Sequence, residues 1–461
     1  MTSRFQALLA EARAILKLGL PLIGAQLAQM SMFFADVAML GHLDKESLAS
    51  MSVGHSSFSF FFAFGIGVCA AVNPLVAQAF GAGRRHELSD TVRRGLWVAL
   101  MLGLAGMAAL SQVRQVFVAL GHPPTLVELG TIYVTTVSWC LVPALCFNVL
   151  KNALDAVSKP QAAFRITVMA AVLNVVLNRI LIFGALGIPA LGIRGAALAT
   201  VMVSLLEVGL ALWVIHGCDE FEDLSELFIF PGWSKLWSVL SVGLPIGVTI
   251  GAECGFFVVG ALMMGRLGVA ESAAHQIALT CAATAFMIPL GLSLAASVRV
   301  GQLTGAERHA EARLAGWVTM GLALLFMSAS ASLFLSFPQV FLSVFMEVDH
   351  TDPQVLAMAT QLLFLAAVFA LFDGLQITAT GALRGLKDVK VPMAIVVVSF
   401  WVFGFAASGW LGFYTPLRHQ GIWIGFVVGL GVAGMSLATR FWYQTRGLVC
   451  SPDGELPSPQ D

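Results

Sequence analysis

The chain has 461 residues, of which 58% are hydrophobic and only 11% are charged. A soluble domain carries about a quarter charged residues on a surface that faces water, so this composition excludes a soluble globule of this size. The formal net charge of −1 provides no basic field for nucleic acid, which argues against a nucleic-acid-binding protein.

Twelve long apolar runs follow one another along the chain, and each reaches the roughly 20 residues that a membrane-crossing helix needs. The first run has no small-residue cleavage site at its end, so we predict a retained span rather than a signal peptide. The sequence therefore predicts an all-α, polytopic membrane protein with twelve transmembrane helices. The predicted spans are 15–41, 50–79, 92–112, 127–150, 162–184, 190–216, 235–265, 272–298, 312–337, 355–383, 390–411 and 420–444.

Basic residues are distributed unevenly between the connections of these spans. Nineteen of the 25 Lys and Arg residues fall near the termini or near the connections that follow even-numbered spans. The connection after the second span, for example, is flanked by Arg84, Arg85, Arg93 and Arg94. Connections rich in Lys and Arg stay in the cytoplasm, so both termini are predicted to be cytoplasmic.

The two halves of the chain resemble each other in sequence. When residues 19–21 (Gly-Leu-Pro) are placed on residues 243–245, which have the same sequence, the loop at 78–84 falls on the similar loop at 302–308. No gap is needed between these two matches. The chain therefore contains an internal repeat of its first half in its second half.

The repeat continues after a short insertion, where residues 192–193 (Gly-Ile) fall on residues 421–422. Each half contains six predicted spans and so has the same orientation, which predicts two six-helix bundles related by a pseudo-two-fold axis along the membrane normal. The expected parts are an N-terminal bundle (1–216), a cytoplasmic linker (217–234), a C-terminal bundle (235–445) and a polar tail (446–461).

Four carboxylates occur within or near the predicted spans: Asp36, Glu207, Glu253 and Asp373. A carboxylate in the hydrocarbon region costs several kcal/mol, so it normally faces a cavity and has a function. Asp36, Glu253 and Asp373 have no counterpart at the repeat-equivalent positions, which favours a functional role over a need of the fold. Glu207 lies nearer the end of its span and is expected to extend toward the headgroups.

Asn174 and Asn178 are spaced i and i+4 in the fifth span and therefore share one helical face. Together with Asp36 they can supply oxygen ligands for a monovalent cation. The alternative is hydrogen bonding between helices, which is common for asparagine in membranes. His275 lies near the start of a span and is expected at the membrane interface.

No motif of an enzyme is present: the chain has no phosphate-binding Gly-x-x-x-x-Gly-Lys, no His-Glu-x-x-His and no nucleophile elbow. We therefore predict a transporter without a cofactor that takes its energy from an ion gradient. One alternative is a flippase for lipid-linked oligosaccharides, which would favour a basic cavity for a pyrophosphate. A membrane-embedded enzyme or a scaffold is the other.

The chain resembles the multidrug and toxic compound extrusion (MATE) family, in its NorM-like branch, from about Leu18 to Tyr443. The resemblance rests on the order and spacing of several short motifs. These are Gly19-Leu20-Pro21, Asp36 with Gly41-His42-Leu43, Asn73-Pro74 with Gln78-Ala79-Phe80-Gly81-Ala82-Gly83, Gly192-Ile193-Arg194-Gly195-Ala196-Ala197, Gly243-Leu244-Pro245, Glu253, Asp373 and Arg384-Gly385.

This resemblance implies a V-shaped pair of six-helix bundles that exports organic cations in exchange for Na⁺ or H⁺. The coupling ion is expected either at Asp36, Asn174 and Asn178 or at Glu253 and Asp373. Some members have a tyrosine in the eighth span near the ion. This chain has none there, and Phe286 is its nearest aromatic candidate.

The expected partners are small organic cations and membrane lipid, with no nucleic acid, and the protein is expected to be a monomer. The expected location is the bacterial inner membrane.

Overall fold

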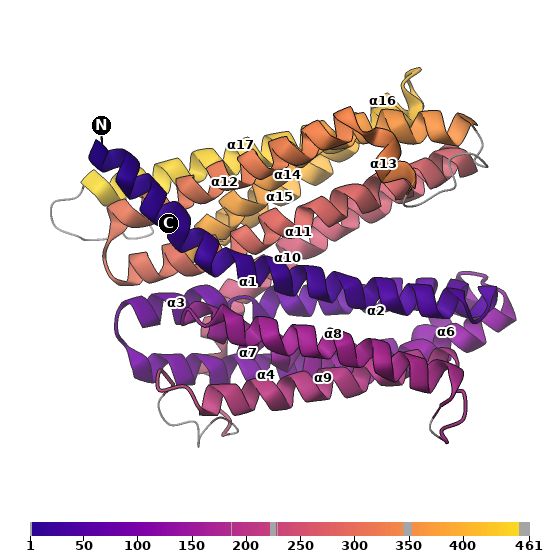
Figure 1. Cartoon of the computed structure of the whole chain (residues 1–461), viewed down its shortest axis with the longest axis horizontal. Coiled ribbons are helices and arrows are strands. Elements are labelled where there is room, and N and C mark those ends of the chain that lie inside the picture. Colours follow the sequence, from indigo (N-terminus) through magenta and orange to yellow (C-terminus); the bar gives the residue numbers. More distant parts are fainter. Residues whose placement is uncertain (1, 186, 222–226, 228, 344–352, 451–461) are drawn as a thin grey trace. The chain divides into compact units, whose positions relative to one another are not determined.

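The computed structural model describes residues 2–185, 187–221, 227, 229–343 and 353–450, and within these ranges it contains helices and no β-strand. Figure 1 shows their arrangement along the chain. Parts of the predicted linker (222–226 and 228) and of the predicted tail (451–461) lie outside the described residues. The longer helices are α1 (Thr2–Gly41), α2 (Lys45–Cys69), α3 (Val72–Gly81), α4 (Arg85–Leu110), α6 (Pro124–Val137), α7 (Leu141–Ala156), α8 (Pro160–Phe183), α9 (Ile193–His216), α10 (Trp233–Leu267), α11 (Val269–Gly305), α12 (His309–Ser336), α14 (Pro353–Gly385), α15 (Lys390–Val398), α16 (Phe405–Phe413) and α17 (Arg418–Cys450).

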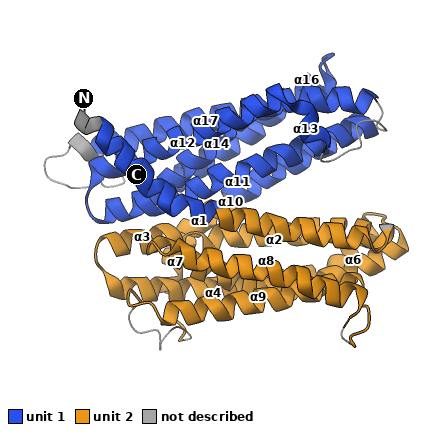
Figure 2. Ribbon diagram, viewed as in Figure 1, with its two compact units in different colours: residues 1–23, 249–461 blue, residues 24–248 orange. Residues whose placement is uncertain are grey.

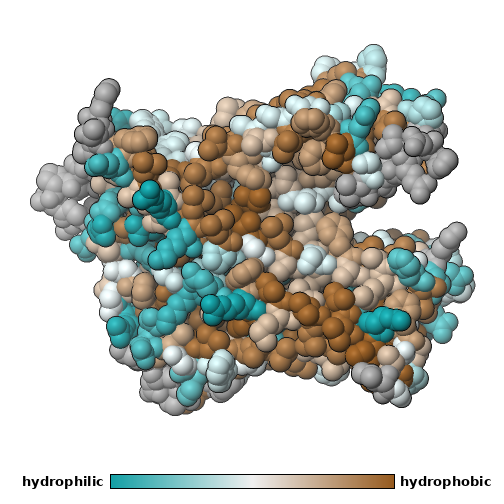
Figure 3. All heavy atoms as spheres, viewed as in Figure 1, coloured by the Kyte–Doolittle hydropathy of each residue, from teal (hydrophilic) through white to brown (hydrophobic). Residues whose placement is uncertain are grey.

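Eleven helical segments among the described residues are long and apolar enough to cross a membrane. They coincide with the second to twelfth predicted spans, and the first predicted span lies within α1. Hydrophobic residues cover the middle of the helices, and hydrophilic residues gather toward their ends (Figure 3). The prediction of an all-α, polytopic membrane protein is confirmed.

Local sequence explains where several helices begin and break. Asp44 caps α2, because its carboxylate accepts hydrogen bonds from the Ser47 amide at 2.5 Å and the Ser47 hydroxyl at 2.8 Å. Pro143 has no N–H to donate, so a regular α-helix cannot continue unchanged through it. The fourth predicted span accordingly changes there from α6 to a short 3₁₀ turn, η1 (Ser138–Cys140), before α7.

The predicted repeat is visible in the backbone at two pairs of helix ends. Gly83 and Glu307, which are equivalent positions in the first part of the repeat, have left-handed φ angles of 71° and 60°. Ser158 and Lys387, which are equivalent positions after the insertion, have φ angles of 62° and 60°. In all four places the amide of the next residue donates to the carbonyl five residues earlier, as in a Schellman helix ending. The two halves therefore end these helices in the same way, although only one of the four residues is glycine.

The chain divides into two compact units, coloured separately in Figure 2. Unit 1 contains residues 1–23 and 249–461, and unit 2 contains residues 24–248. These boundaries differ from the predicted bundles at 1–216 and 235–445, because the first residues of each predicted half belong to the unit formed by the other half.

Contacts at the start of α1 explain its membership of unit 1. Arg299 of α11 donates two hydrogen bonds to the Glu11 carboxylate, at 2.7 and 2.9 Å. Ile15 and Leu22 are buried in one cluster with Leu292 of α11. A bidentate Arg–carboxylate pair fixes geometry as well as adding energy, so this segment is held firmly in unit 1.

A glycine allows this close approach of α1 to α11. A methyl group on Gly291 would lie 2.7 Å from the backbone nitrogen of Ile23, whereas one on Gly251 would meet nothing within 4 Å. We expect Gly291→Ala to lower the free energy of unfolding by roughly 1–3 kcal/mol, the usual cost of overpacking. Gly251→Ala is the matched control and should leave stability unchanged or slightly higher. Thermal unfolding in detergent measures both, and equal melting temperatures would contradict this reading of the contact.

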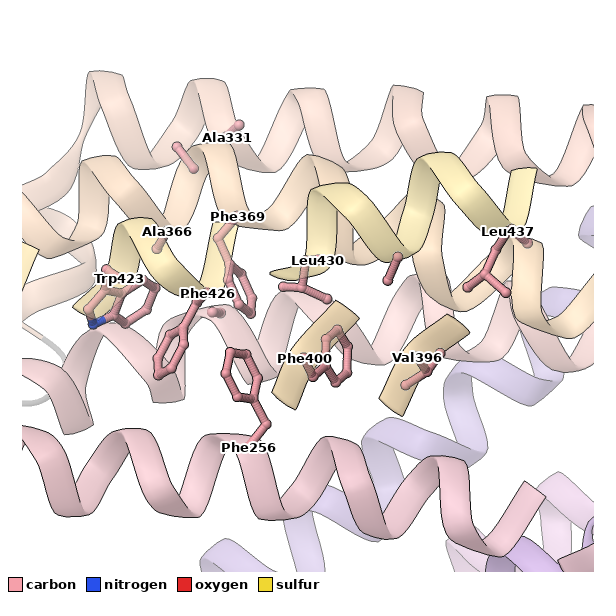
Figure 4. Close-up of a cluster of buried hydrophobic side chains, with 14 of the residues drawn as sticks. Phe256, Ala331, Ala366, Phe369, Val396, Phe400, Trp423, Phe426, Leu430 and Leu437 are labelled. Carbon is pink, nitrogen blue, oxygen red and sulfur yellow. The ribbon is translucent and has the colours of Figure 1, made fainter. Parts of the chain in front are cut away.

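An aromatic cluster fills the core of unit 1, as Figure 4 shows. Phe256 of α10 stacks on Phe400 with ring centroids 5.2 Å apart and meets Phe426 of α17 edge-on at 5.1 Å. Trp423 of the same cluster donates a hydrogen bond from Nε1 to Nδ1 of His275, at 3.1 Å. His275 is only 1% exposed, so the expectation of an interfacial histidine is wrong. Its polar partner is the buried indole of Trp423 rather than water or a headgroup at the membrane interface.

The connection after α9 is attached to unit 2 by an ion pair. Nζ of Lys159 lies 2.5 Å from Oε2 of Glu220. Partial burial would raise the pKa of the Glu220 carboxyl, but the Lys159 ammonium outweighs it and holds that pKa below its usual range. The same contact raises the pKa of Lys159. Both shifts favour the charged pair at neutral pH.

Candidate cation-binding sites

Unit 2 brings together three of the residues singled out in the sequence. Asp36 lies near the end of α1, and Asn174 and Asn178 lie on one face of α8. Nδ2 of Asn178 donates to Oδ1 of Asp36 at 2.5 Å and to Oδ1 of Asn174 at 3.1 Å. Both asparagines are buried, at 2% and 0% exposed. The spacing of four residues places both amides beside the carboxylate of the neighbouring helix.

This site has one unused acceptor. Oδ1 of Asn178 is buried and has no hydrogen-bond partner among the described residues. Buried amide oxygens are normally paired, so an unpaired one beside a carboxylate is a feature of a site that accepts a donor or a cation. The carboxylate and amide oxygens present are the ligand type that a hard cation such as Na⁺ prefers. They fit a proton equally well, because Asp36 alone can carry it.

Tyr133 of α6 also belongs to this surrounding, although the sequence did not point to it. Its ring is 4% exposed, and its hydroxyl interacts electrostatically with Asp36. A tyrosine hydroxyl can donate to a carboxylate or accept from a proton donor. Its only sequence signal is that it is one of three tyrosines in the chain.

Unit 1 contains the second set of predicted residues. Glu253 lies on α10, and Asp373 lies on α14, where it is 4% exposed. The two carboxyls act on each other electrostatically. Arg384 lies near the end of α14 and is 9% exposed. Its positive charge interacts electrostatically with the Glu253 carboxyl. Unit 1 thus contains a buried acid, a half-buried acid and a buried base that act on one another.

Gln376 lies between these charges on α14. It is completely buried, and neither its amide oxygen nor its amide nitrogen has a partner in the described part of the chain. Such a side chain loses the hydrogen bonds it made to water unless a ligand or water replaces them. Gln376 has no signal in the sequence, and Arg384 stands out there only through the Arg384-Gly385 motif.

Two further residues stand apart from these sets. Phe286 is half-buried on α11, and its contact with a coupling ion stays a prediction. Glu207 of α9 does not extend to the headgroups as expected, because it is buried at 7% exposed and its Oε1 has no partner among the described residues.

The architecture defines a class of protein: a multi-pass membrane protein of two repeated halves, with acidic groups buried inside each unit. Secondary transporters are typically built from such internal repeats.

Comparisons with known proteins narrow this class to one family. The MatE family profile matches residues 21–180 and again 245–408. The two matches start at Pro21 and Pro245, which are equivalent positions of the predicted repeat. The chain belongs to the MatE family.

Named relatives and solved structures agree. A "Probable multidrug resistance protein NorM" of Synechocystis is 36% identical over 94% of both chains. One of Rhizobium meliloti with the same name is 37% identical over 95% of both. The fold matches a multidrug resistance MATE family transporter, solved in an outward-facing conformation, with a TM-score of 0.86 at 21% identity over 96% of this chain and 97% of that one.

Proposed function

We propose that this chain is a secondary active multidrug efflux transporter that exports small organic cations in exchange for Na⁺ or H⁺. The observation that carries the proposal is the Asp36 carboxylate, placed inside unit 2 beside two buried amides, one with an unpaired oxygen. A carboxylate in this position can bind only one positively charged ligand at a time, whether an ion, a proton or an organic cation. Competition between the ion and the drug for that charge would couple import of one to export of the other.

The same reasoning applies to Glu253 and Asp373 in unit 1. Repulsion between the two carboxylates favours the uptake of a proton or a cation. The positive charge of Arg384 already offsets part of the negative charge at Glu253, so a single added positive charge suffices to balance the pair. We propose that both units take part in cation binding. The chain's excess of Lys and Arg on one side supports cytoplasmic termini, and its relatives support an inner-membrane location.

The buried charges argue against a flippase for lipid-linked pyrophosphates. Such a substrate requires an excess of buried base. The buried base Lys151 acts on two carboxyls of unit 2, those of Asp155 and Glu207. The buried base Arg384 acts on Glu253 of unit 1, which also acts on Asp373. In both groups the acids outnumber the base.

Transport of a fluorescent organic cation tests the proposed function. Purified full-length protein is reconstituted into liposomes with an imposed Na⁺ gradient, an imposed pH gradient or neither. We expect transport with one ion gradient and none without it, because a ligand shifts a conformational equilibrium only through its differential affinity. Replacement of Na⁺ by choline then identifies the coupling ion. Transport at the same rate in the absence of both gradients would contradict secondary active export.

A further inference from the structure

Unit 2 contains a second group of buried charges that the proposed function does not use. Lys151 lies near the end of α7, and its Nζ donates to Oε1 of Gln26 at 3.2 Å. Its ammonium acts electrostatically on two carboxyls, those of Asp155 and Glu207. Asp155 follows Lys151 by four residues and so lies on the same face of α7, whereas Glu207 comes from α9, which packs against α7.

All three side chains are removed from solvent. Lys151 is 5% exposed, Asp155 2% and Glu207 7%. Oδ1 of Asp155 and Oε1 of Glu207 are buried without a hydrogen-bond partner in the described part of the chain. Each carboxyl therefore has an oxygen that is available to a proton.

The remaining charges near this group do not balance it. On α4, Arg93 and Arg94 both pair with Asp90. The thiol of Cys140 in η1 faces Glu207 but is neutral as a thiol. The charged residues of the helices beside α9 are exposed, namely Glu128 of α6 and Arg165 and Arg179 of α8, as are Arg194 and His216 at the ends of α9 itself. One ammonium and two carboxylates thus leave one negative charge uncompensated in the interior.

We propose that Asp155, Glu207 and Lys151 form a proton-binding site in unit 2, in which the Lys151 ammonium balances one carboxylate and the other carboxyl holds one extra proton. The proton binds to Oε1 of Glu207 or Oδ1 of Asp155 and makes the group neutral. A metal ion is disfavoured because the Lys151 ammonium repels it and already occupies the Gln26 oxygen. Na⁺ would also need several neutral oxygens, which the described partners do not offer.

Lys151 and Asp155 lie toward the opposite end of unit 2 from Asn178. Only residues 157–159 separate the end of α7 from the start of α8, so Lys151 and Asp155 lie near the start of α8. Asn178, which binds Asp36, lies roughly 27 Å further along α8, at 1.5 Å per residue. Lys151 and Asp155 are therefore too far from Asp36 to be ligands of the predicted cation site, whose partners are Asn174 and Asn178.

Infrared spectroscopy of the purified full-length protein tests this proposal, because a protonated carboxylic acid has a carbonyl band that shifts in D₂O. Both Glu207→Gln and Asp155→Asn should remove the intensity of one protonated acid at neutral pH. Either substitution deletes one negative charge and leaves a balanced pair with Lys151, so the result does not depend on which carboxyl holds the proton. Lys151→Met should instead increase the band, since two carboxyls then lack a counter-charge.

Glu128→Gln, which replaces an exposed acid of the same unit, is the matched control and should leave the band unchanged. An unchanged band in both Glu207→Gln and Asp155→Asn would overturn the proposal, and each variant suffices if the other does not fold. The intensity that belongs to this site is the difference between the wild-type band and the band of Glu207→Gln or Asp155→Asn. Loss of that difference on exchanging choline for Na⁺ would overturn the choice of a proton. This difference reports on Asp155 and Glu207 whether or not the protein exports drugs, so failure of the transport assay is a separate result.

Discussion

Asp36→Asn is expected to abolish export of organic cations while the protein still inserts and folds. Asparagine has nearly the shape of aspartate, and its amide oxygen can still accept the hydrogen bond that Asn178 donates to Asp36. Only the negative charge is lost, and with it the competition between the ion and the drug. We expect the ion-driven rate to fall to that of protein-free liposomes, a loss of at least about tenfold, which corresponds to roughly 1.4 kcal/mol.

The measurement is the initial rate of fluorescent-cation transport under the gradient that drives the wild type, together with the melting temperature in detergent. Glu128→Gln removes an exposed carboxylate from the same unit and should transport normally. Wild-type transport by Asp36→Asn would remove Asp36 from the mechanism. A large fall in melting temperature would assign the residue to folding instead.

Arg384→Met is expected to destabilise unit 1 by roughly 3–5 kcal/mol, the usual effect of breaking a buried charge arrangement from one side. Arg384 is the buried base that acts on Glu253, and Glu253 in turn repels Asp373. Without the guanidinium, Glu253 loses the base that acts on it, while the Asp373 carboxyl still repels it. Methionine keeps the length and apolar stem of the side chain, so packing changes little.

The thermal unfolding of a double variant distinguishes charge from packing. If charge is the cause, Arg384→Met combined with Glu253→Gln should recover much of the lost stability, because the coupling energy between interacting residues is non-additive. Arg308→Met is the control, since Arg308 pairs with Glu311 on an exposed surface where such a pair contributes at most about 1 kcal/mol. Equal stability of Arg384→Met and the wild type would show that Arg384 does not balance these acids.

Hydropathy was sufficient to predict the helical spans, because lipid imposes a length and a composition on every crossing helix. The repeat followed from identical residues at equivalent positions, such as Gly-Leu-Pro at 19–21 and 243–245. The i, i+4 spacing of Asn174 and Asn178 also predicted that they share a face. Their contact with Asp36 is present in the structure, whereas their role in ion binding remains a prediction.

The misplaced and missed residues have a common cause. Lys151 and Arg384 lie near the ends of predicted spans, where a basic residue gives no sign of a buried role, and Glu207 is expected to extend to the headgroups. A long side chain near a helix end can extend outward or turn inward, and the sequence does not show which neighbouring helix closes the outward route.

The two halves of the repeat differ in charge at one buried position. Asp155 and Arg384 are equivalent positions of the two halves, and each lies just before a Schellman ending, yet they carry opposite charges.

The Gly-Leu-Pro repeat also has a mechanical consequence. The chain passes between the two units twice, at 23/24 and 248/249, and both passages lie inside continuous helices rather than loops. Pro21 precedes the first passage and Pro245 the second, and proline is where a helix bends most readily.

A loop would absorb a reorientation of the units at almost no elastic cost, but a helix resists bending and twisting. Any change in the angle between the units must therefore deform α1 and α10 close to these prolines. The residues around the two passages therefore determine how strongly α1 and α10 resist such a change.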